Sequence, residues 1–356
     1  MRIGIDAKWI LSGPVSGKIV IKNIIENFPK KKNLFIFVKK KEYSRIFKRY
    51  GKNFNIIPIP FFLNNAFTNF FILPFYIKKF NLNVMVYQTY GSIFFKSKSL
   101  VYVHDLLFLD FPKYFTFFEK IYFFPILHIL KFAKAIITIS NSEKKRITSH
   151  IKKKNIKVVH CSADHLNKIK AIKPKTNFIL KNYILYVGRL NDRKNIQILL
   201  NSFNNFINKK IKLVIVGNVS HKFNNFEKLI KLNNLKSKIK LIQNASDNNI
   251  KWLYKNAEIF CFPSYAEGFG MPPLEAMSQG CPVVLSDIPP HREICGNSAL
   301  YFNPNDKKEL IIQINKLLTN KKIKSKYIVR GLNRYKKYNW KKSSSLINKI
   351  VNKYFI

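Results

Sequence analysis

The chain has 356 residues, of which 47% are apolar, so it is long enough to bury about two domain cores of ordinary size. Its 64 lysine and arginine residues against 18 acidic residues give a formal net charge of +46. The four cysteines, at positions 161, 261, 281 and 295, have neither the spacing of a disulfide framework nor that of a zinc site, so we expect reduced, buried thiols.

The strong positive charge has two explanations. Basic proteins bind polyanions, which include nucleic acid and the anionic headgroups of a membrane. Here the excess of lysine runs along the whole chain and selects no particular site. We therefore expect drift in composition as the main cause and no nucleic-acid partner, and we leave peripheral contact with an anionic membrane open.

Nothing in the sequence indicates secretion or a membrane-spanning helix. The N-terminus, MRIGIDAKW, enters a strand-like pattern and lacks an apolar segment of signal-peptide length. The most apolar stretches, residues 61–80 and 111–139, are interrupted by polar residues before they reach the ~18 apolar residues that a spanning helix needs. We expect a cytoplasmic protein, with a peripheral position on the inner face of the cell membrane left open.

The stretch 61–80 is rich in aromatic residues and has Lys78 and Lys79 near one end. This pattern is consistent with a face that lies at a membrane interface. A core helix or a covering loop would give the same composition, and we prefer that interpretation.

Residues 1–167 alternate short β-rich runs with helical patterns such as residues 18–28. The predicted strands are MRIGID, LFIFVKK, FNIIPIP, NVMVYQ, LVYVHD, AIITIS and IKVVHC. Strands that are separated by helices pair in parallel. We expect a doubly wound, Rossmann-like α/β domain over residues 1–167.

Residues 168–181, KIKAIKPKTNFILK, are basic and show little periodicity, so we expect a linker. The alternation then restarts, which predicts a second Rossmann-like domain over residues 182–338. Its predicted strands are YILYVGR, KLVIVG, IKLIQN, EIFCFPS and CPVVLS, and its predicted helices are residues 195–208, 226–232, 248–256, a helix from Pro272, and residues 304–318. The last segment, residues 339–356, is expected to be a helix that crosses back to the first domain.

Ligands of open parallel sheets bind beyond the carboxyl ends of the strands. Two such domains that face each other make a cleft between those ends. Motifs that directly follow predicted strands are therefore candidates for the functional site.

The stretch SYAEGFGMPPLEAMSQG, residues 264–280, follows a predicted buried strand. Prolines suit the first turn of the next helix, and Gly280 suits its end. Glu267 in the loop and Glu275 in the first helical turn can both point into the crevice, where backbone N–H groups of residues 268–271 are exposed and can attract anions. Either glutamate alone has an ordinary explanation, but the pair suits the hydroxyls of a sugar or a ribose.

A second motif, YVGRLNDRKN, also follows a strand. Gly188 permits a sharp turn, after which Arg189 and Lys194 can reach over the same strand end. Two cations there suit a diphosphate and can stabilise charge on a departing phosphate, although ordinary surface charge is the alternative.

These segments resemble the retaining, nucleotide-sugar-dependent glycosyltransferases of the GT-B fold, often called family four or glycosyl transferases group 1. The resemblance is carried by VGRLNDRKN and by LYKNAEIFCFPSYAEGFGMPPLEAMSQGCPVVLSDIPPHREICGNSALYFNP, in which Glu267 and Glu275 form the E-x7-E motif. It is dense over residues 183–306 and looser in the first half. The resemblance implies a GT-B fold, that is, two doubly wound Rossmann-like domains facing across a cleft.

The resemblance also implies a role for each matching residue. Glu267 would bind the hydroxyls of the donor sugar, and Glu275 would bind the donor ribose. In the looser half, His104 in LVYVHD would border the sugar. The diphosphate would be bound by Arg189 and Lys194, by the backbone of Gly268, Phe269, Gly270 and Met271, and by Gly13 and Gly17 in the glycine-rich loop LSGPVSGKI.

We accordingly expect a retaining glycosyltransferase that moves a hexosyl group, such as mannosyl, from a GDP- or UDP-sugar to a glycan or lipid-linked acceptor of surface polysaccharide or lipopolysaccharide synthesis. The resemblance implies no metal and no other cofactor, since no D-x-D motif is present. Glu267, His104, Arg189 and Lys194 are the expected catalytic residues. Two alternatives stay open: a non-catalytic protein of the same fold that binds polyanions or membrane surfaces, and a sugar phosphorylase or epimerase.

Overall fold

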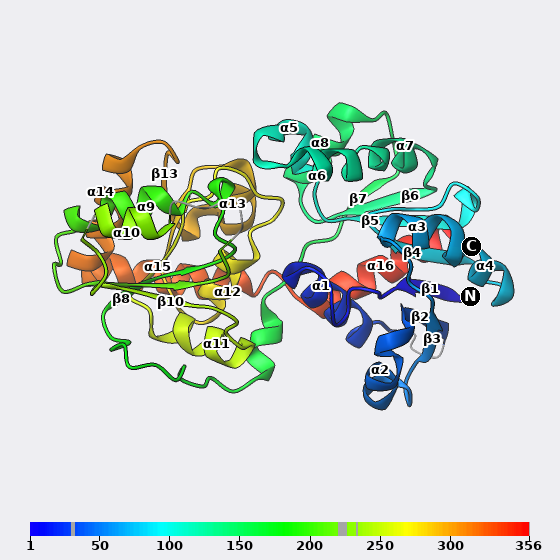
Figure 1. Ribbon diagram of the computed structural model, residues 1–356, viewed down its shortest axis with the longest axis horizontal. Coiled ribbons are helices and arrows are strands. Elements are labelled where there is room, and N and C mark those ends of the chain that lie inside the picture. The colour runs from blue at the N-terminus through cyan, green and yellow to red at the C-terminus, as the bar shows by residue number, and fades with distance from the viewer. Residues whose placement is uncertain (30–32, 220–225, 233, 356) are drawn as a thin grey trace. The chain divides into compact units, whose positions relative to one another are not determined.

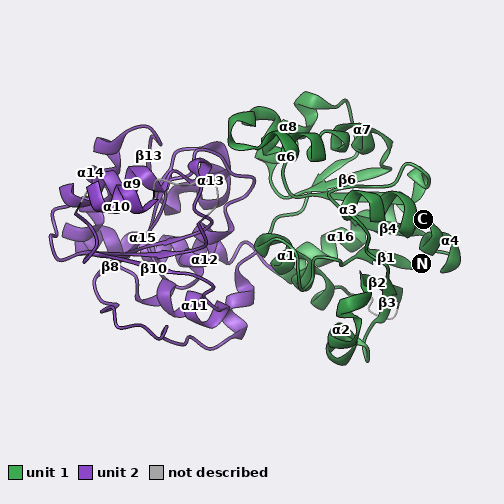
Figure 2. Cartoon of the chain, in the orientation of Figure 1, with its two compact units in different colours: residues 1–161, 340–356 green, residues 162–339 purple. Residues whose placement is uncertain are grey.

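The computed structural model describes residues 1–29, 33–219, 226–232 and 234–355. They form two compact units, which are coloured separately in Figure 2. Unit 1 combines Met1–Cys161 with Trp340–Ile356, and unit 2 is Ser162–Asn339. The division that we expected after residue 167 thus falls after Cys161, and the final helix belongs to unit 1. Its last residue, Ile356, lies outside the described residues.

Unit 1 is built on a seven-stranded parallel sheet with the order β3-β2-β1-β4-β5-β6-β7. All seven strand predictions are confirmed, because buried parallel strands are nearly continuous apolar runs that are easily recognised in a sequence. The strands are β1 (Ile3–Asp6), β2 (Leu34–Lys39), β3 (Asn55–Ile59), β4 (Val84–Gln88), β5 (Ser99–Val103), β6 (Ala135–Thr138) and β7 (Ile156–Val158).

Helices cover both faces of this sheet. Figure 1 shows α1 (Val15–Glu26) and α16 (Trp340–Phe355) on one side, and α6 (Phe117–Phe123), α7 (Pro125–Phe132) and α8 (Asn141–His150) on the other. The remaining helical segments are η2 (Lys40–Glu42), α2 (Tyr43–Tyr50), α3 (Asn65–Phe67), η3 (Thr68–Ile72), α4 (Leu73–Lys79), η4 (Lys96–Lys98), α5 (Leu107–Asp110) and η5 (Pro112–Tyr114).

The C-terminal helix α16 packs against α1 at the other end of the sequence. The Ser344 hydroxyl donates to the carbonyl of Ile24 over 3.0 Å, and Trp340 and Val351 are buried. The core of unit 1 therefore includes residues from both ends of the chain.

Unit 2 is built on a six-stranded parallel sheet with the order β10-β9-β8-β11-β12-β13. Its strands are β8 (Tyr183–Val187), β9 (Lys212–Val216), β10 (Ile239–Ile242), β11 (Ile259–Phe262), β12 (Val283–Ser286) and β13 (Leu300–Phe302). The helical segments are η6 (Asp164–Lys168), η7 (Asp192–Lys194), α9 (Ile196–Ser202), η8 (Phe203–Asn205), α10 (Phe226–Leu232), α11 (Asp247–Asn256), α12 (Met271–Ser278), α13 (Pro289–Cys295), η9 (Gly296–Ser298), α14 (Lys307–Thr319) and α15 (Lys321–Tyr335). In Figure 1, α9, α10 and α14 lie on one side of the sheet and α11 on the other.

The segment 168–181 is irregular, as expected, but it is not a free linker. The amide of Asn248 donates to the carbonyl of Lys170 over 2.7 Å, and the amide of Asn249 donates to the carbonyl of Ile172 over 2.9 Å. Asparagines in the first turn of α11 thus satisfy carbonyl groups that have no partner in a sheet. The segment is part of unit 2.

Within the part of the chain that the structure describes, no helix is both long enough and apolar enough to span a bilayer. The apolar stretches 61–80 and 111–139 fold into short helices and the strand β6.

Candidate functional site

The candidate site lies where the strand order of unit 2 reverses, between β8 and its neighbour β11. At such a point the loops that follow two adjacent parallel strands separate and leave room for a ligand. The loops after β8 and β11 contact each other, since the backbone N–H of Tyr265 donates to the carbonyl of Arg193 over 2.9 Å. Both predicted motifs of the second domain are therefore at one edge of one sheet.

Glu267 is held at this edge by two cations from the loop after β8. Its Oε1 lies 2.5 Å from Nζ of Lys194, and its Oε2 lies 3.5 Å from Nη1 of Arg193. Arg193 also donates to the carbonyl of Ala266. Burial alone would raise the pKa of Glu267, but Lys194 and Arg193 outweigh burial and lower this pKa to about 2. The glutamate is therefore ionised although it is buried.

The structure brings Lys194 to Glu267 but leaves the Arg189 side chain exposed. Arg193, to which the sequence analysis gave no role, is partly buried and lies beside Glu267 instead. The short helix η7 explains the choice: the Asn191 side chain accepts from the backbone N–H of Lys194 over 3.1 Å, and Asn195 is left-handed at φ 52°. This tight turn directs both Arg193 and Lys194 toward the loop after β11. The adjacent Arg-Lys pair was the only sequence signal for Arg193.

The loop after β11 turns into α12 at Gly270, which has φ 93° and precedes the first helical residue, Met271. A Cβ atom here would lie 3.2 Å from Cδ2 of His291, so both the conformation and the close approach favour glycine. Phe269 and Met271 are buried, as is Gly268, and the ring of Phe269 packs edge-on to Tyr338 with centroids 6.0 Å apart. Any contact of Phe269 with a ligand would therefore come from its backbone.

Glu275, the second glutamate of the motif, has different partners. It is the fifth residue of α12, and its Oε2 accepts from the Tyr254 hydroxyl over 3.0 Å. The Nε2 atom of His165 lies 3.6 Å from Oε1. Burial raises the pKa of Glu275 to about 7, although the hydrogen bond from Tyr254 acts in the opposite direction. The two carboxylates of one motif thus have pKa values displaced in opposite directions.

The buried His291 was also missed by the sequence analysis, which quoted PPHREIC without giving it a role. Its Nδ1 lies 2.9 Å from the carbonyl of Ser286, and its ring is 5.7 Å from that of Phe262. Nε2 has no hydrogen-bond partner among the residues that the structure describes. Burial lowers the pKa of His291 to about 4, so the ring is neutral and, with Nδ1 as donor, Nε2 is an acceptor.

In unit 1, His104 follows β5 beside the strand-order reversal between β1 and β4. Its Nε2 lies 2.9 Å from Oε1 of Gln88, and burial lowers the pKa of His104 to about 4. Cβ atoms on Gly13 and Gly17 would lie 2.3 and 2.9 Å from side-chain atoms of Trp9. Packing on Trp9 is therefore sufficient to explain both glycines.

In the described part of the chain, no three His, Cys, Asp or Glu side chains gather as a metal would require. The charged groups of the site are the carboxylates and cations named above.

Comparisons with known proteins concern the family and the fold. Residues 168–334 match the family model described as Glycosyl transferases group 1. The chain is 31% identical over 237 residues to the O-antigen chain mannosyltransferase RfbU of Salmonella typhimurium, an alignment that covers 65% of this chain and 64% of that protein. The chain thus spans slightly less than two thirds of that relative.

Solved structures show the same fold over almost the whole chain. The Anabaena protein Alr3699/HepE in complex with UDP-glucose has a TM-score of 0.76 at 14% identity and covers 99% of this chain and 100% of its own. WaaG, a glycosyltransferase involved in lipopolysaccharide biosynthesis, has a TM-score of 0.71 at 12% identity and covers 98% of this chain and 99% of its own. The fold is the GT-B fold that the sequence predicted.

Proposed function

We propose that this chain is a retaining glycosyltransferase, because residues 168–334 match the model of the glycosyl transferases group 1 family. It moves a hexosyl group, in our proposal mannosyl, from a nucleoside diphosphate sugar to a hydroxyl of a glycan or lipid-linked acceptor. The names of RfbU and WaaG, which refer to O-antigen and lipopolysaccharide, support a role in surface polysaccharide synthesis. The observation that carries the proposal is the buried, ionised Glu267 beside Lys194 at the reversal of strand order.

In the proposed reaction, the bond between the anomeric carbon and the donor phosphate breaks, and the acceptor oxygen bonds to the same face of that carbon. The acceptor proton passes to the departing phosphate, whose negative charge is stabilised by Lys194 and Arg189. A two-step route would need a carboxylate nucleophile beside an acid partner. Glu267 is instead paired with Lys194 and Arg193, so we assign it to the hydroxyls of the donor sugar.

The other residues of the site bind the donor in this proposal. Glu275 accepts hydrogen bonds from the ribose hydroxyls. The backbone of Gly268, Phe269, Gly270 and Met271 contacts the sugar and the diphosphate, and that of Gly13 and Gly17 contacts the diphosphate. Neutral His104 borders the sugar. The cations Lys194 and Arg189 take the place of a metal ion.

The proposal also concerns the nucleotide of the donor, which is UDP or GDP. The bound UDP-glucose of the Anabaena neighbour supports UDP, whereas nothing in the geometry distinguishes UDP from GDP. We place the protein in the cytoplasm, at the inner face of the membrane when its acceptor is linked to a lipid.

A thermal-shift panel of GDP-mannose, UDP-glucose and ADP-glucose tests the proposal. A ligand at 100 times its Kd stabilises the native state by about 2.7 kcal/mol, so the true donor should raise Tm by several degrees. Release of nucleoside diphosphate should then depend on an added acceptor.

A control variant distinguishes the effect of a lysine in the site from the effect of lowering the net charge. Lys194→Met should lower turnover by about 10² to 10³, whereas Lys210→Met, which removes an exposed lysine from the same unit, should leave turnover unchanged. If no nucleotide sugar stabilises the protein and it binds nucleic acid with steep salt dependence, the non-catalytic alternative is correct and our proposal is wrong.

A further inference from the structure

Three consecutive helical segments of unit 1, α3, η3 and α4, bury Leu73 and Ile77 in the core but also bury polar side chains and expose phenylalanines. The polar residues Asn65, Thr68 and Asn69 are buried. Phe71 and Phe75, one turn apart, are 59% and 62% exposed. A surface helix of a water-soluble domain normally places its apolar residues against the core.

Hydrogen bonds hold the polar side of these segments inward. Oδ1 of Asn69 accepts from Nζ of Lys8 over 2.5 Å, and its Nδ2 donates to the carbonyl of Tyr90 over 2.6 Å. Nδ2 of Asn65 donates to the carbonyl of Gln88 over 3.1 Å. Rotation of the helix to bury its phenylalanines would break these buried bonds and leave polar atoms unsatisfied. The outward position of the aromatic side chains is therefore fixed by the fold.

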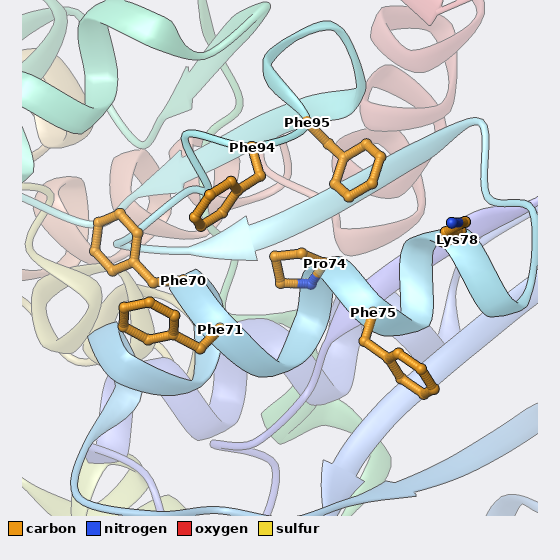
Figure 3. Close-up of a pocket in the computed structure, with 7 residues that line it drawn as sticks. All are labelled: Phe70, Phe71, Pro74, Phe75, Lys78, Phe94 and Phe95. Atoms are coloured by element: carbon orange, nitrogen blue, oxygen red, sulfur yellow. The ribbon is translucent and has the colours of Figure 1, made fainter.

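The exposed rings border a groove of about 410 Å³ on the surface of unit 1 (Figure 3). Figure 3 shows rings from the helix on one side and rings from the loop after β4 on the other. In that loop, Phe94 is 61% exposed. The lining residues are Phe70, Phe71, Pro74, Phe75, Lys78, Phe94 and Phe95. Exposed apolar surfaces of this kind mark sites of interaction.

Lysines lie at the ends of the segments that form this surface, and Lys78 lines the groove itself. Lys78 and Lys79 end α4, and Lys96 begins η4, with its Nζ 4.2 Å above the ring of Phe132. The sequence contains no acidic residue between Glu42 and Asp105. Proteins bind an anionic membrane surface by inserting aromatic rings at the boundary between headgroups and acyl chains and by placing ammonium groups at the headgroups.

We propose that Phe71, Phe75 and Phe94, with Lys78, Lys79 and Lys96, form a lipid-binding face that inserts into the interface of an anionic bilayer. The charge selects the occupant: the surface offers only positive charge and apolar rings, which complement anionic headgroups above acyl chains. The lipid-binding face lies in unit 1 and uses none of the donor-binding residues of unit 2. It names the membrane partner that the proposed function leaves open and does not depend on the donor chemistry.

Sedimentation of the full chain with lipid vesicles tests this inference. The protein should bind vesicles of phosphatidylcholine and phosphatidylglycerol in equal parts, should bind pure phosphatidylcholine weakly, and should lose affinity as salt rises. The triple variant Phe71→Ser/Phe75→Ser/Phe94→Ser should bind the anionic vesicles at least about tenfold more weakly. Each change of Lys78, Lys79 or Lys96 to glutamine should weaken binding by about fivefold and reduce the preference for anionic lipid.

The matched control is Ile312→Ser/Val329→Ser, which removes two apolar side chains of unit 2 that are 61% and 56% exposed. It should not change vesicle binding. The lysine variants keep the test decisive if the phenylalanine variant fails to fold. Equal binding by the wild type and both sets of variants would overturn the proposal, and so would a wild-type dimer that the phenylalanine variant lacks. Donor-induced thermal shifts should persist in every variant, which separates this inference from the proposed function.

Discussion

Replacing Glu275 with glutamine should stabilise the protein at alkaline pH and weaken donor binding at the same time. Burial raises the pKa of Glu275 from 4.5 to about 7. Since the folded protein then binds this proton more tightly than the unfolded chain does, stability falls as pH rises from 4.5 to 7. The difference of 2.5 pH units corresponds to a penalty of about 3 kcal/mol above pH 7.

Glutamine removes the ionisation and keeps an oxygen that accepts from the Tyr254 hydroxyl. The variant should therefore match the wild type at pH 4 and exceed its Tm by roughly 6 to 12 °C at pH 8. Scanning calorimetry of both proteins between pH 4 and 8 measures this difference. Glu227→Gln, at an exposed glutamate of α10, is the control and should show no such trend.

A Tm difference that is constant with pH, or a variant that is less stable at pH 8, would refute the electrostatic reasoning. The functional part is tested separately by the thermal shift with nucleotide sugar. Because the amide oxygen accepts from Tyr254 and the amide NH2 group cannot accept from a ribose hydroxyl, we expect donor affinity to fall by at least about tenfold. An unchanged affinity would remove Glu275 from the donor site.

Three further predictions concern the loops after β8 and β11. Lys194→Met leaves buried Glu267 with Arg193 at 3.5 Å, so we expect turnover to fall by about 10² to 10³ and urea unfolding to show a loss of about 3 kcal/mol; normal turnover would contradict the assignment. Since the pKa of Glu267 is lowered to about 2, its ion pair stabilises the fold above pH 4.5, and this contribution disappears as pH falls toward 2. When the free energy of unfolding is measured between pH 4.5 and 2, it should fall less steeply in Lys194→Met than in the wild type. Equal slopes in the two proteins would count against this reasoning. Gly270→Ala places a Cβ 3.2 Å from Cδ2 of His291 at φ 93°, and should cost about 1 to 2 kcal/mol in denaturant unfolding, with a neutral result arguing against the turn.

The sequence was sufficient for the architecture because parallel strands that are buried on both faces are continuous apolar runs. The strand β13, LYF, was missed because polar residues follow it at once, whereas the equally short β7 continues into the apolar Val159. The segment 168–181 was taken for a linker because its attachment to α11 depends on asparagine amides that no periodicity reveals. Local patterns thus predicted the elements, whereas contacts between distant segments were not accessible from them.

In the candidate site, too, local motifs could be predicted from the sequence, whereas contacts that depend on the fold could not. Lys194 and Glu267 follow strands and belong to recognisable motifs, so their proximity could be expected. Which arginine joins them depends on the turn of η7, which turns Arg193 inward and leaves Arg189 exposed. The position of His291 beneath the loop depends on the packing of α13 against α12, and its sequence context gave no sign of it.

The placement of α16 in unit 1 has a consequence for synthesis of the chain. The ribosome completes every residue of unit 2 before it makes Trp340, the first residue of the segment that finishes the core of unit 1. Domains generally fold as units in the order in which they are completed. Unit 2 can therefore reach its native state first. Unit 1 is completed only when α16 is made, and until then the surface of α1 that α16 covers is accessible to chaperones.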